Sequence, residues 1–187
     1  MEREKLLQIL NEEVGNKNII KHMLATEACM VALAEKLEAE DKEAWAMAGL
    51  MHDGDYRDDV PVEEQGVKIS QVLKEKGINL SNEVAHAMAA HNCHHTGVEP
   101  ESLMDWALFC CDSLTGLIVA TTLVLPDKKL SEVTVERVMN RYAEPKFAAG
   151  TRREEIKMCE EKLGIPLEEF VGVCLKAMQS ISDDLGL

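Results

Sequence analysis

Apolar side chains in this chain recur every three to four residues, and this helical period is the feature that most limits its fold. Between residues 18 and 39 the apolar stripe includes Ile19, Met23, Met30 and Leu37, which fall on one face of a helix. The alternation of β-branched and aromatic residues that is typical of strands is scarce, and aromatic residues make up only 4% of the chain. We therefore predict an all-α fold, a compact helical bundle.

Glycine, proline and asparagine residues interrupt this pattern and divide it into predicted helices. Asn18, Ser131 and Thr151 are the residues expected at three of the helix N-termini. No linker divides the chain, so we expect one domain of 187 residues, with a core at about 18–125 and a C-terminal helical extension at about 126–187 packed on it. The helices are expected at residues 4–13, 18–39, 43–52, 63–76, 81–91, 102–124, 131–140, 151–163 and 167–185, with a loop at 92–100.

Charge and apolar content argue against two classes of partner. The chain has 20 Lys and Arg against 34 Asp and Glu, a net charge of −14 at pH 7, so a nucleic-acid polymer would be repelled. No uninterrupted apolar run reaches the roughly 18 to 20 residues of a membrane span, and the charged N-terminus is unlike a signal peptide. We expect a cytoplasmic protein with no membrane partner, whose six cysteines are free thiols. The oligomeric state stays open.

Four residues with metal-binding side chains stand near apolar helical segments: His22, His52, Asp53 and Asp112. Asp112 lies inside the apolar stretch 107–114, where an unpaired carboxylate would be costly to bury. Two imidazoles and two carboxylates suit one divalent transition metal such as Mn, Fe, Co or Zn, and they leave positions open for water and substrate. Each residue alone could be a hydrogen-bonded core residue, but the four together predict a metal site.

The order of these residues resembles the H…HD…D pattern of the HD-domain superfamily of metal-dependent phosphohydrolases, over about residues 22–124. The stretch His52–Tyr56 is similar to an HD-x-DY sequence in uncharacterised bacterial members, and residues 89–92 and 107–118 resemble two further motifs of theirs. The resemblance implies an HD-domain-like helical bundle in which the four residues named above bind the metal.

Two positions depart from the pattern of this superfamily. Tyr56 stands where many members have a lysine, so the basic group near the phosphate must come from elsewhere, and Arg57 is our candidate for substrate binding. Gln65 occupies the place of a histidine in members with two metals, and because an amide oxygen binds such ions weakly, a second metal is doubtful. His91 matches the remaining histidine of that second site. The basic residues at 146–153 are expected to pair with neighbouring carboxylates or to face solvent.

The activity that the resemblance implies is hydrolysis of a small phosphate ester, a nucleotide or another phosphomonoester, by a metal-activated water. Asp53 would orient or deprotonate the water, and His91 would protonate the leaving group or stabilise its charge. Two alternatives remain at this point. One is a metal-containing protein that senses or binds a nucleotide without turnover. The other is a helical interaction protein whose histidines are structural.

Overall fold

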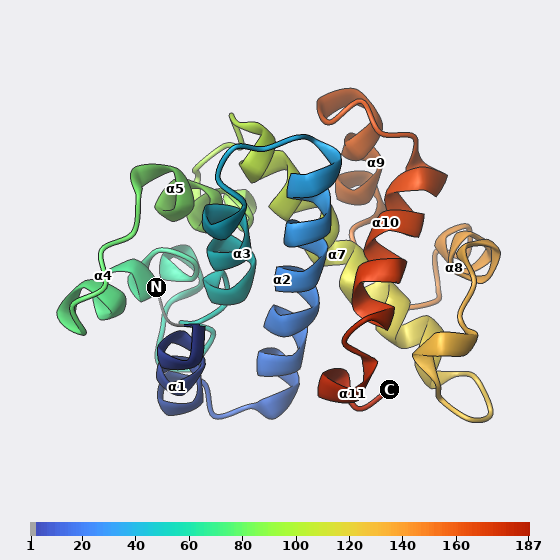
Figure 1. The fold of residues 1–187 in the computed structure, drawn as a ribbon, viewed down its shortest axis with the longest axis horizontal. Coiled ribbons are helices and arrows are strands. Elements are labelled where there is room, and N and C mark those ends of the chain that lie inside the picture. Colours follow the sequence, from blue (N-terminus) through green and yellow to red (C-terminus); the bar gives the residue numbers. More distant parts are fainter. Residues whose placement is uncertain (1–2) are drawn as a thin grey trace.

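The computed structural model describes residues 3–187, and over that range the chain is helical and contains no strand (Figure 1). The prediction of an all-α fold is therefore confirmed. The elements are α1 (Arg3–Glu13), α2 (Lys17–Lys36), α3 (Lys42–Met51), the 3-10 turn η1 (Val62–Glu64), α4 (Lys68–Glu75), α5 (Asn82–Ala90), α6 (Cys93–Thr96), α7 (Leu103–Leu123), the 3-10 turn η2 (Leu130–Glu132), α8 (Val135–Tyr142), α9 (Arg153–Lys162), α10 (Leu167–Gln179) and α11 (Ser182–Leu185).

Two long helices, α2 and α7, lie at the centre of the molecule. α3 packs on α2, and α5 packs on both α3 and α7. α9 packs on α7, and α10 packs on both α2 and α7. Figure 1 shows α1, α3, α4 and α5 on one side of the central pair and α8, α9 and α10 on the other. The C-terminal helices are thus packed on the core helices, as expected.

Aliphatic side chains fill the space between the central helices. Met23, Met30 and Leu33 of α2 have no exposed surface, and neither do Leu108 and Leu114 of α7. Burying a side chain of this size contributes roughly 1.5–3 kcal/mol. This packing fixes the positions of α2 and α7, which carry two of the candidate metal ligands.

α7 is 21 residues long and, by length and composition alone, apolar enough to cross a membrane. Polar residues such as Asp112 and Ser113 interrupt the helix, so it contains no uninterrupted apolar run long enough to span a membrane. In its most apolar window 61% of the residues are buried inside the protein, as in a core helix. At its N-terminus Ser102 and Asp105 form a capping box, which satisfies two backbone N–H groups.

Helix starts differ from the prediction where several residues compete to cap the helix. Asn16, rather than Asn18, caps α2, and its side chain accepts a hydrogen bond from the backbone N–H of Asn18. Thr134, rather than Ser131, caps α8, whereas Ser131 lies in η2. In both cases two candidate caps lie within three residues of each other. The backbone conformation, which sequence does not give, decides between them.

Four predicted elements are divided differently in the structure. The range 63–76 covers part of η1 and all of α4 with a turn at 65–67 between them, and the range 131–140 covers parts of η2 and α8. The loop at 92–100 contains α6, and the range 167–185 contains α10 and α11. The turn at 65–67 places Gln65 and Gly66 beside the candidate metal ligands.

Candidate metal centre

The ends of two helices present histidines to the same point in the molecule. His52 and His91 are the C-cap residues of α3 and α5. The Nδ1 atom of His52 lies 2.8 Å from the carbonyl oxygen of Gly49, and Nδ1 of His91 contacts the carbonyl of Met88 in the same way. Each ring therefore donates its Nδ1–H to the last turn of its own helix, and its Nε2 atom is free to bind a metal.

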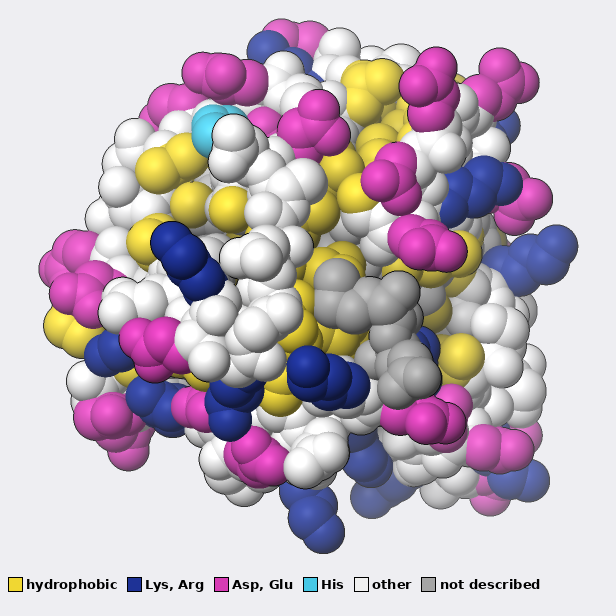
Figure 2. Space-filling view, turned by 60° about the vertical axis from the view of Figure 1, so that its left-hand side comes forward, with side chains coloured by type: hydrophobic (Ala, Val, Ile, Leu, Met, Phe, Trp, Pro, Cys, Tyr) yellow, Lys and Arg dark blue, Asp and Glu magenta, His cyan; other side chains and the backbone are white. Residues whose placement is uncertain are grey.

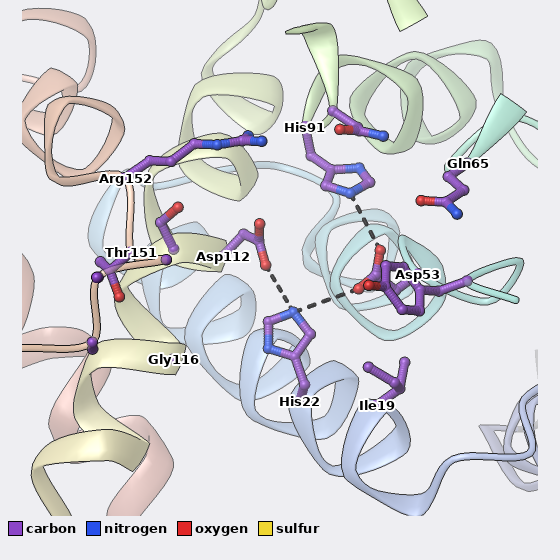
Figure 3. Close-up of a pocket in the computed structure, with 15 residues that line it drawn as sticks. Ile19, His22, Asp53, Gln65, His91, Asp112, Gly116, Thr151 and Arg152 are labelled. Atoms are coloured by element: carbon purple, nitrogen blue, oxygen red, sulfur yellow. Dashed lines mark ion pairs between the residues drawn. The ribbon is translucent and has the colours of Figure 1, made fainter. Parts of the chain in front are cut away.

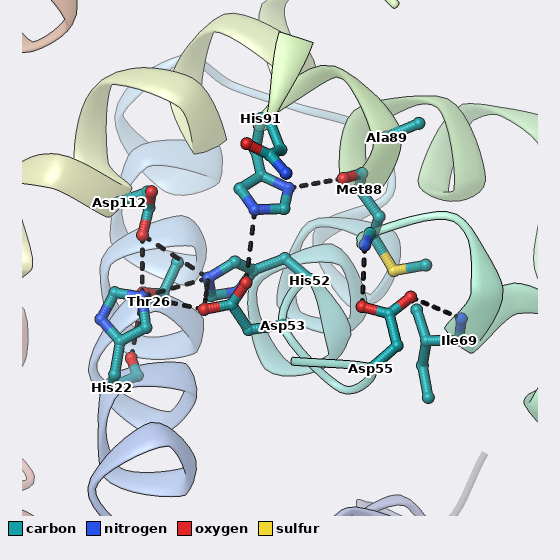
Figure 4. A network of polar contacts seen from close by, with 12 residues as sticks. His22, Thr26, His52, Asp53, Asp55, Ile69, Met88, Ala89, His91 and Asp112 are labelled. Atoms are coloured by element: carbon teal, nitrogen blue, oxygen red, sulfur yellow. Dashed lines mark hydrogen bonds and ion pairs between the residues drawn. The ribbon is translucent and has the colours of Figure 1, made fainter. Parts of the chain in front are cut away.

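His22 and Asp112 complete this group from the central helices α2 and α7 (Figure 4). Nε2 of His22 lies 2.8 Å from Oδ1 of Asp112 and 3.2 Å from Nε2 of His52. Oδ2 of Asp53 lies 3.8 Å from Nε2 of His22 and 3.7 Å from Nε2 of His52. Ligand atoms held about 2.0–2.2 Å from one ion lie roughly 3 to 3.5 Å apart, so this spacing is close to that of a metal site.

The hydrogen bonds of the His22 ring fix its tautomer as well. The hydroxyl of Thr115 donates to the backbone carbonyl of Asp112 at 2.8 Å, so at 3.1 Å it accepts from Nδ1–H of His22. The Nε2 atoms of His22 and His52 lie 3.2 Å apart, and both also face the carboxylate of Asp112. Two unprotonated Nε2 atoms at this distance repel each other unless a cation or a proton lies between them. This donor set fits a divalent transition metal.

Asp53 joins this group to His91. Its Oδ2 atom faces His22 and His52, whereas its Oδ1 atom lies 3.4 Å from Nε2 of His91. The His52 and His91 rings meet edge to face, with centroids 4.8 Å apart. The ligand atoms thus form two groups that share His52: His22, His52 and Asp112 in one, and His52, Asp53 and His91 in the other.

The charges of this cluster support one another. Burial opposes the charge on Asp112, but its contacts with His22 and His52 outweigh burial and hold its pKa well below its usual range. Burial also opposes the charge on Asp53. The histidines that face it, His52 and His91, outweigh burial and lower the pKa of Asp53 overall. For His91 burial lowers the pKa, yet the hydrogen bond and charge of Asp53 raise it above its usual value. The carboxylates are therefore ionised and ready to bind a cation.

Asp55 holds the turn that closes one side of the site. It is 2% exposed, and its carboxylate accepts hydrogen bonds from the backbone N–H groups of Gly66 and Ile69, both at 2.8 Å. Burial raises its pKa despite these two bonds. Gly66 has φ +85°, and a Cβ atom there would lie 2.3 Å from the carbonyl oxygen of Met88 and 3.0 Å from Cε1 of His91. Only glycine can bring the backbone this close to the histidine.

A cavity of about 540 Å³ opens beside these residues, and we call it the first cavity. One wall carries the side chains of His22, Asp53, His91 and Asp112 (Figure 3). The opposite wall is the backbone turn at 148–152, which ends in the side chain of Arg152. Tyr56 and Gln65 also line the cavity, and they are the two residues that depart from the superfamily pattern.

The structure does not bring Arg57 to this cavity. Its guanidinium is bound to Glu13 at 2.7 Å and to Asp59 at 3.1 Å, and it is not among the lining residues. Arg152 lines the cavity instead, with Nη1 3.0 Å from Glu155. The expectation that Arg152 pairs with a neighbouring carboxylate is met, but sequence reasoning did not foresee that this pair faces the site. The sequence around Arg152 gives little indication of this position, because the position depends on an irregular turn.

Buried contacts hold the Arg152 wall in place. Glu155 is 3% exposed, and besides Arg152 its carboxylate contacts His94 at 2.9 Å and accepts from the hydroxyl of Ser113 at 2.8 Å. Arg153 does not face the cavity. Its guanidinium donates to backbone carbonyls of the preceding turn, including that of Phe147 at 2.6 Å. Glu155 and Arg153 thus fix the two ends of the segment that faces the metal ligands.

The family model for the HD domain matches residues 19–117, slightly more than half of the 187 residues. The matched range includes every histidine and aspartate of the candidate metal centre and leaves Arg152 outside. No curated protein and no solved structure gave a significant match. The helical fold, the histidine and aspartate cluster and the family match agree, and we conclude that this chain belongs to the HD domain family, a superfamily of metal-dependent phosphohydrolases.

Proposed function

We propose that this protein hydrolyses a small phosphate ester, a nucleotide or another phosphomonoester, with a water activated by one divalent transition metal. The observation that carries the proposal is the convergence of three imidazole Nε2 atoms and two carboxylates beside the first cavity, where His22, Asp53, His91 and Asp112 line the wall and His52 is fully buried. Each Nε2 atom faces a carboxylate of this cluster, and all of these atoms lie close enough together to share one ion. Mn, Fe, Co and Zn all suit these ligands.

The residues that would hold the ion are His22, His52, Asp53 and Asp112. When bound there, such an ion lowers the pKa of a water molecule and withdraws charge from a phosphoryl oxygen. Asp53 lies between the metal ligands and His91, so its carboxylate would orient the attacking water and accept its proton. His91 lines the cavity and would donate a proton to the departing oxygen.

Arg152 replaces Arg57 as the candidate for binding the phosphate. It lies across the first cavity from the metal ligands, and Glu155 holds one of its guanidinium nitrogens. A guanidinium has five N–H donors, so others remain for phosphoryl oxygens on the cavity side. This local positive charge is needed because the protein as a whole carries −14.

A second candidate function is nucleotide sensing without turnover. Tyr56 and Gln65 line the cavity at the positions where related proteins carry a lysine and a histidine. A site that lacks both groups would still bind a metal and a phosphate, but with fewer groups to stabilise the transition state.

A small phosphorylated molecule suits the surface better than a nucleic-acid polymer does. On the face shown in Figure 2, Lys and Arg side chains are interspersed with Asp and Glu and do not form one continuous basic patch. With a net charge of −14, this surface offers little to attract a polyanion.

The test is to remove metal from the purified protein with a chelator and to add back Mn, Fe, Co or Zn one at a time. Phosphate release is then measured with nucleoside monophosphates and simple alkyl phosphates. We expect release with at least one ion, and the loss of both activity and bound metal in Asp112→Asn, which keeps the side-chain shape. Metal-dependent nucleotide binding without any release would favour the sensor, and failure to bind metal would overturn both functions.

A further inference from the structure

A second cavity of about 440 Å³ adjoins the first, and both are lined by His22 and Gly116. Its walls are mostly aliphatic: Ala25 comes from α2, Val119 and Leu123 from α7, and Leu185 from α11. The metal ligand His22 therefore stands between a polar cavity and an apolar one.

One face of α7 connects the two cavities. Asp112, Gly116, Val119 and Leu123 are spaced by four, three and four residues, so they follow one another along the same face of the helix. At 1.5 Å per residue, Leu123 lies about 16 Å beyond Asp112 along the axis. A ligand that starts at the metal ligands and follows this face passes Gly116 and reaches the apolar walls.

Gly116 has no structural reason to be a glycine. Glycine inside a helix is unfavourable relative to alanine. At Gly49 the cost has a clear cause, because a Cβ atom would lie 2.9 Å from Cα of Glu27, where α2 and α3 pack closely. At Gly116 a Cβ atom would meet nothing within 4 Å, and φ is not positive. What the glycine provides is open space at a position that lines both cavities.

The second cavity suits an aliphatic group better than a nucleobase. Leu123 is 49% exposed, and together with Val119 and Leu185 it forms a continuous apolar lining rather than an isolated exposed side chain. The polar atoms of His22 and Thr115 are already bonded within the metal centre. Asn18 and Lys21 are the other polar side chains that line it. A base has several ring nitrogens and carbonyl groups that need hydrogen-bond partners, and only Asn18 and Lys21 could supply them here, whereas an alkyl chain needs none.

We propose that the substrate is a phosphate monoester of an aliphatic alcohol, with its phosphate in the first cavity and its alkyl chain passing over Gly116 into the second. This rests on the proposed function and narrows its substrate class. In the reaction, water forms a new bond to phosphorus, the bond from phosphorus to the alkyl oxygen breaks, and that oxygen takes up a proton. The products are inorganic phosphate and the alcohol, so no oxidant or further reactant is required.

The first experiment compares ethyl, butyl, hexyl and octyl phosphate, the last below its micelle concentration. Binding to the metal-free protein is measured by calorimetry, and hydrolysis by the metal-loaded protein is measured as kcat/KM. Each methylene that enters the second cavity should improve both quantities by roughly two- to fourfold. Equal values for ethyl and octyl phosphate, or a nucleoside monophosphate preferred over octyl phosphate, would overturn the inference and leave the proposed function standing.

The second experiment places a side chain where the two cavities share Gly116. Gly116→Leu should bring the octyl-to-ethyl ratio close to one in both assays. Ala120→Leu adds the same side chain to α7 at a residue that lines neither cavity, and it should keep the ratio. Gly116→Ala should raise Tm by a few degrees, since nothing in the fold requires glycine there. A ratio that survives Gly116→Leu would overturn the inference.

The two proposals can fail separately. If no phosphate ester is hydrolysed with any ion, the proposed hydrolysis is wrong. Calorimetry with the metal-free protein still tests whether the second cavity binds an alkyl chain. A chain-length dependence of binding that Gly116→Leu removes would then support an aliphatic ligand for a protein without turnover. An affinity that does not change with the length of the alkyl chain would overturn the inference as well.

Discussion

The two walls of the first cavity are built in different ways. The metal wall comes from helices packed at the centre of the fold, and backbone carbonyls or Thr115 orient each of its imidazoles. The opposite wall is an irregular turn at 148–152, which the buried carboxylate of Glu155 and the guanidinium of Arg153 hold in place. The HD domain match ends at residue 117 and covers only the first wall. We propose a division of labour, in which the family region would supply the chemistry and the C-terminal region would select the substrate.

The largest effect on metal content and activity is expected from substitutions that distinguish the roles of the two metal-ligand groups. His52 belongs to both groups, so His52→Ala should release all bound metal and lower activity by at least about 100-fold, since losing even an outer contact of a metal site costs 10- to 100-fold. His91→Ala should keep the metal held by the other residues and lose turnover. Elemental analysis after dialysis against a mild chelator, together with phosphate release, measures both.

The metal count in the unmodified protein checks the same assignment. One equivalent should survive dialysis, because Gln65 offers only an amide oxygen where a second site would need a stronger ligand. Two retained equivalents would contradict this prediction, as would full metal retention in His52→Ala.

The next effect concerns the opposite wall. Arg152→Ala should raise KM for a phosphate ester by roughly 10- to 150-fold, which corresponds to the loss of about 1.5–3 kcal/mol from hydrogen bonds to a charged group. Metal content should stay the same. Arg57→Ala tests the residue that sequence favoured, and it should change KM far less because Arg57 is bound to Glu13 outside the cavity. If Arg57 proved the more sensitive residue, our description of this wall would be wrong.

A smaller effect is the pH dependence of the metal-free protein. The pKa of His91 is raised in the folded state, so its stabilising contribution is complete below the unfolded value of about 6.5 and is lost as pH rises through the folded value. The free energy of unfolding should therefore fall over that window, with a slope of at most about 1.4 kcal/mol per pH unit. Urea unfolding at several pH values measures the slope. His91→Gln should flatten it, and an unchanged slope would assign the proton to another group.

The smallest effect is expected in the reactivity of the cysteine thiols. These thiols lie both in the core helices and in the C-terminal helices, so their labelling shows whether the two regions unfold together. All six cysteines are free and buried, and burial raises the pKa of Cys159 to about 12, so none should react with a thiol reagent at pH 8 in the native protein. With increasing denaturant all six should become reactive in one transition, as the prediction of a single domain requires. Earlier labelling of Cys159 and Cys174 than of Cys29 would show that the C-terminal helices open first.

Several residues of the metal wall stand out in the sequence because they conflict with their surroundings, and their role as metal ligands stays a prediction. Asp112 is a carboxylate in an apolar helix, and His52 and Asp53 end the helix with the most apolar circumference. Such conflicts are local, so a single sequence shows them. The helices were predictable for the same reason, since their period is local.

The Arg152 wall was not predictable because its geometry comes from distant contacts. Glu155 is held by Ser113 and His94, which lie 42 and 61 residues away in the sequence. No local sequence pattern predicts these pairs. Arg57 shows the opposite case. It is close to Asp53 in the sequence, yet its side chain is held by Glu13 of α1. Closeness in the sequence did not predict which arginine faces the site.

The pair of Nε2 atoms at 3.2 Å would tie the lifetime of the protein to its metal supply. An ion held by both atoms would add its binding free energy to the folded state alone, so the loaded protein would unfold less readily than the metal-free one. A ligand present at 100 times its Kd adds about 2.7 kcal/mol to the stability of the state that binds it. A cell short of the ion would therefore lose activity twice: first because the site is empty, and then because proteases remove the transiently unfolded chains.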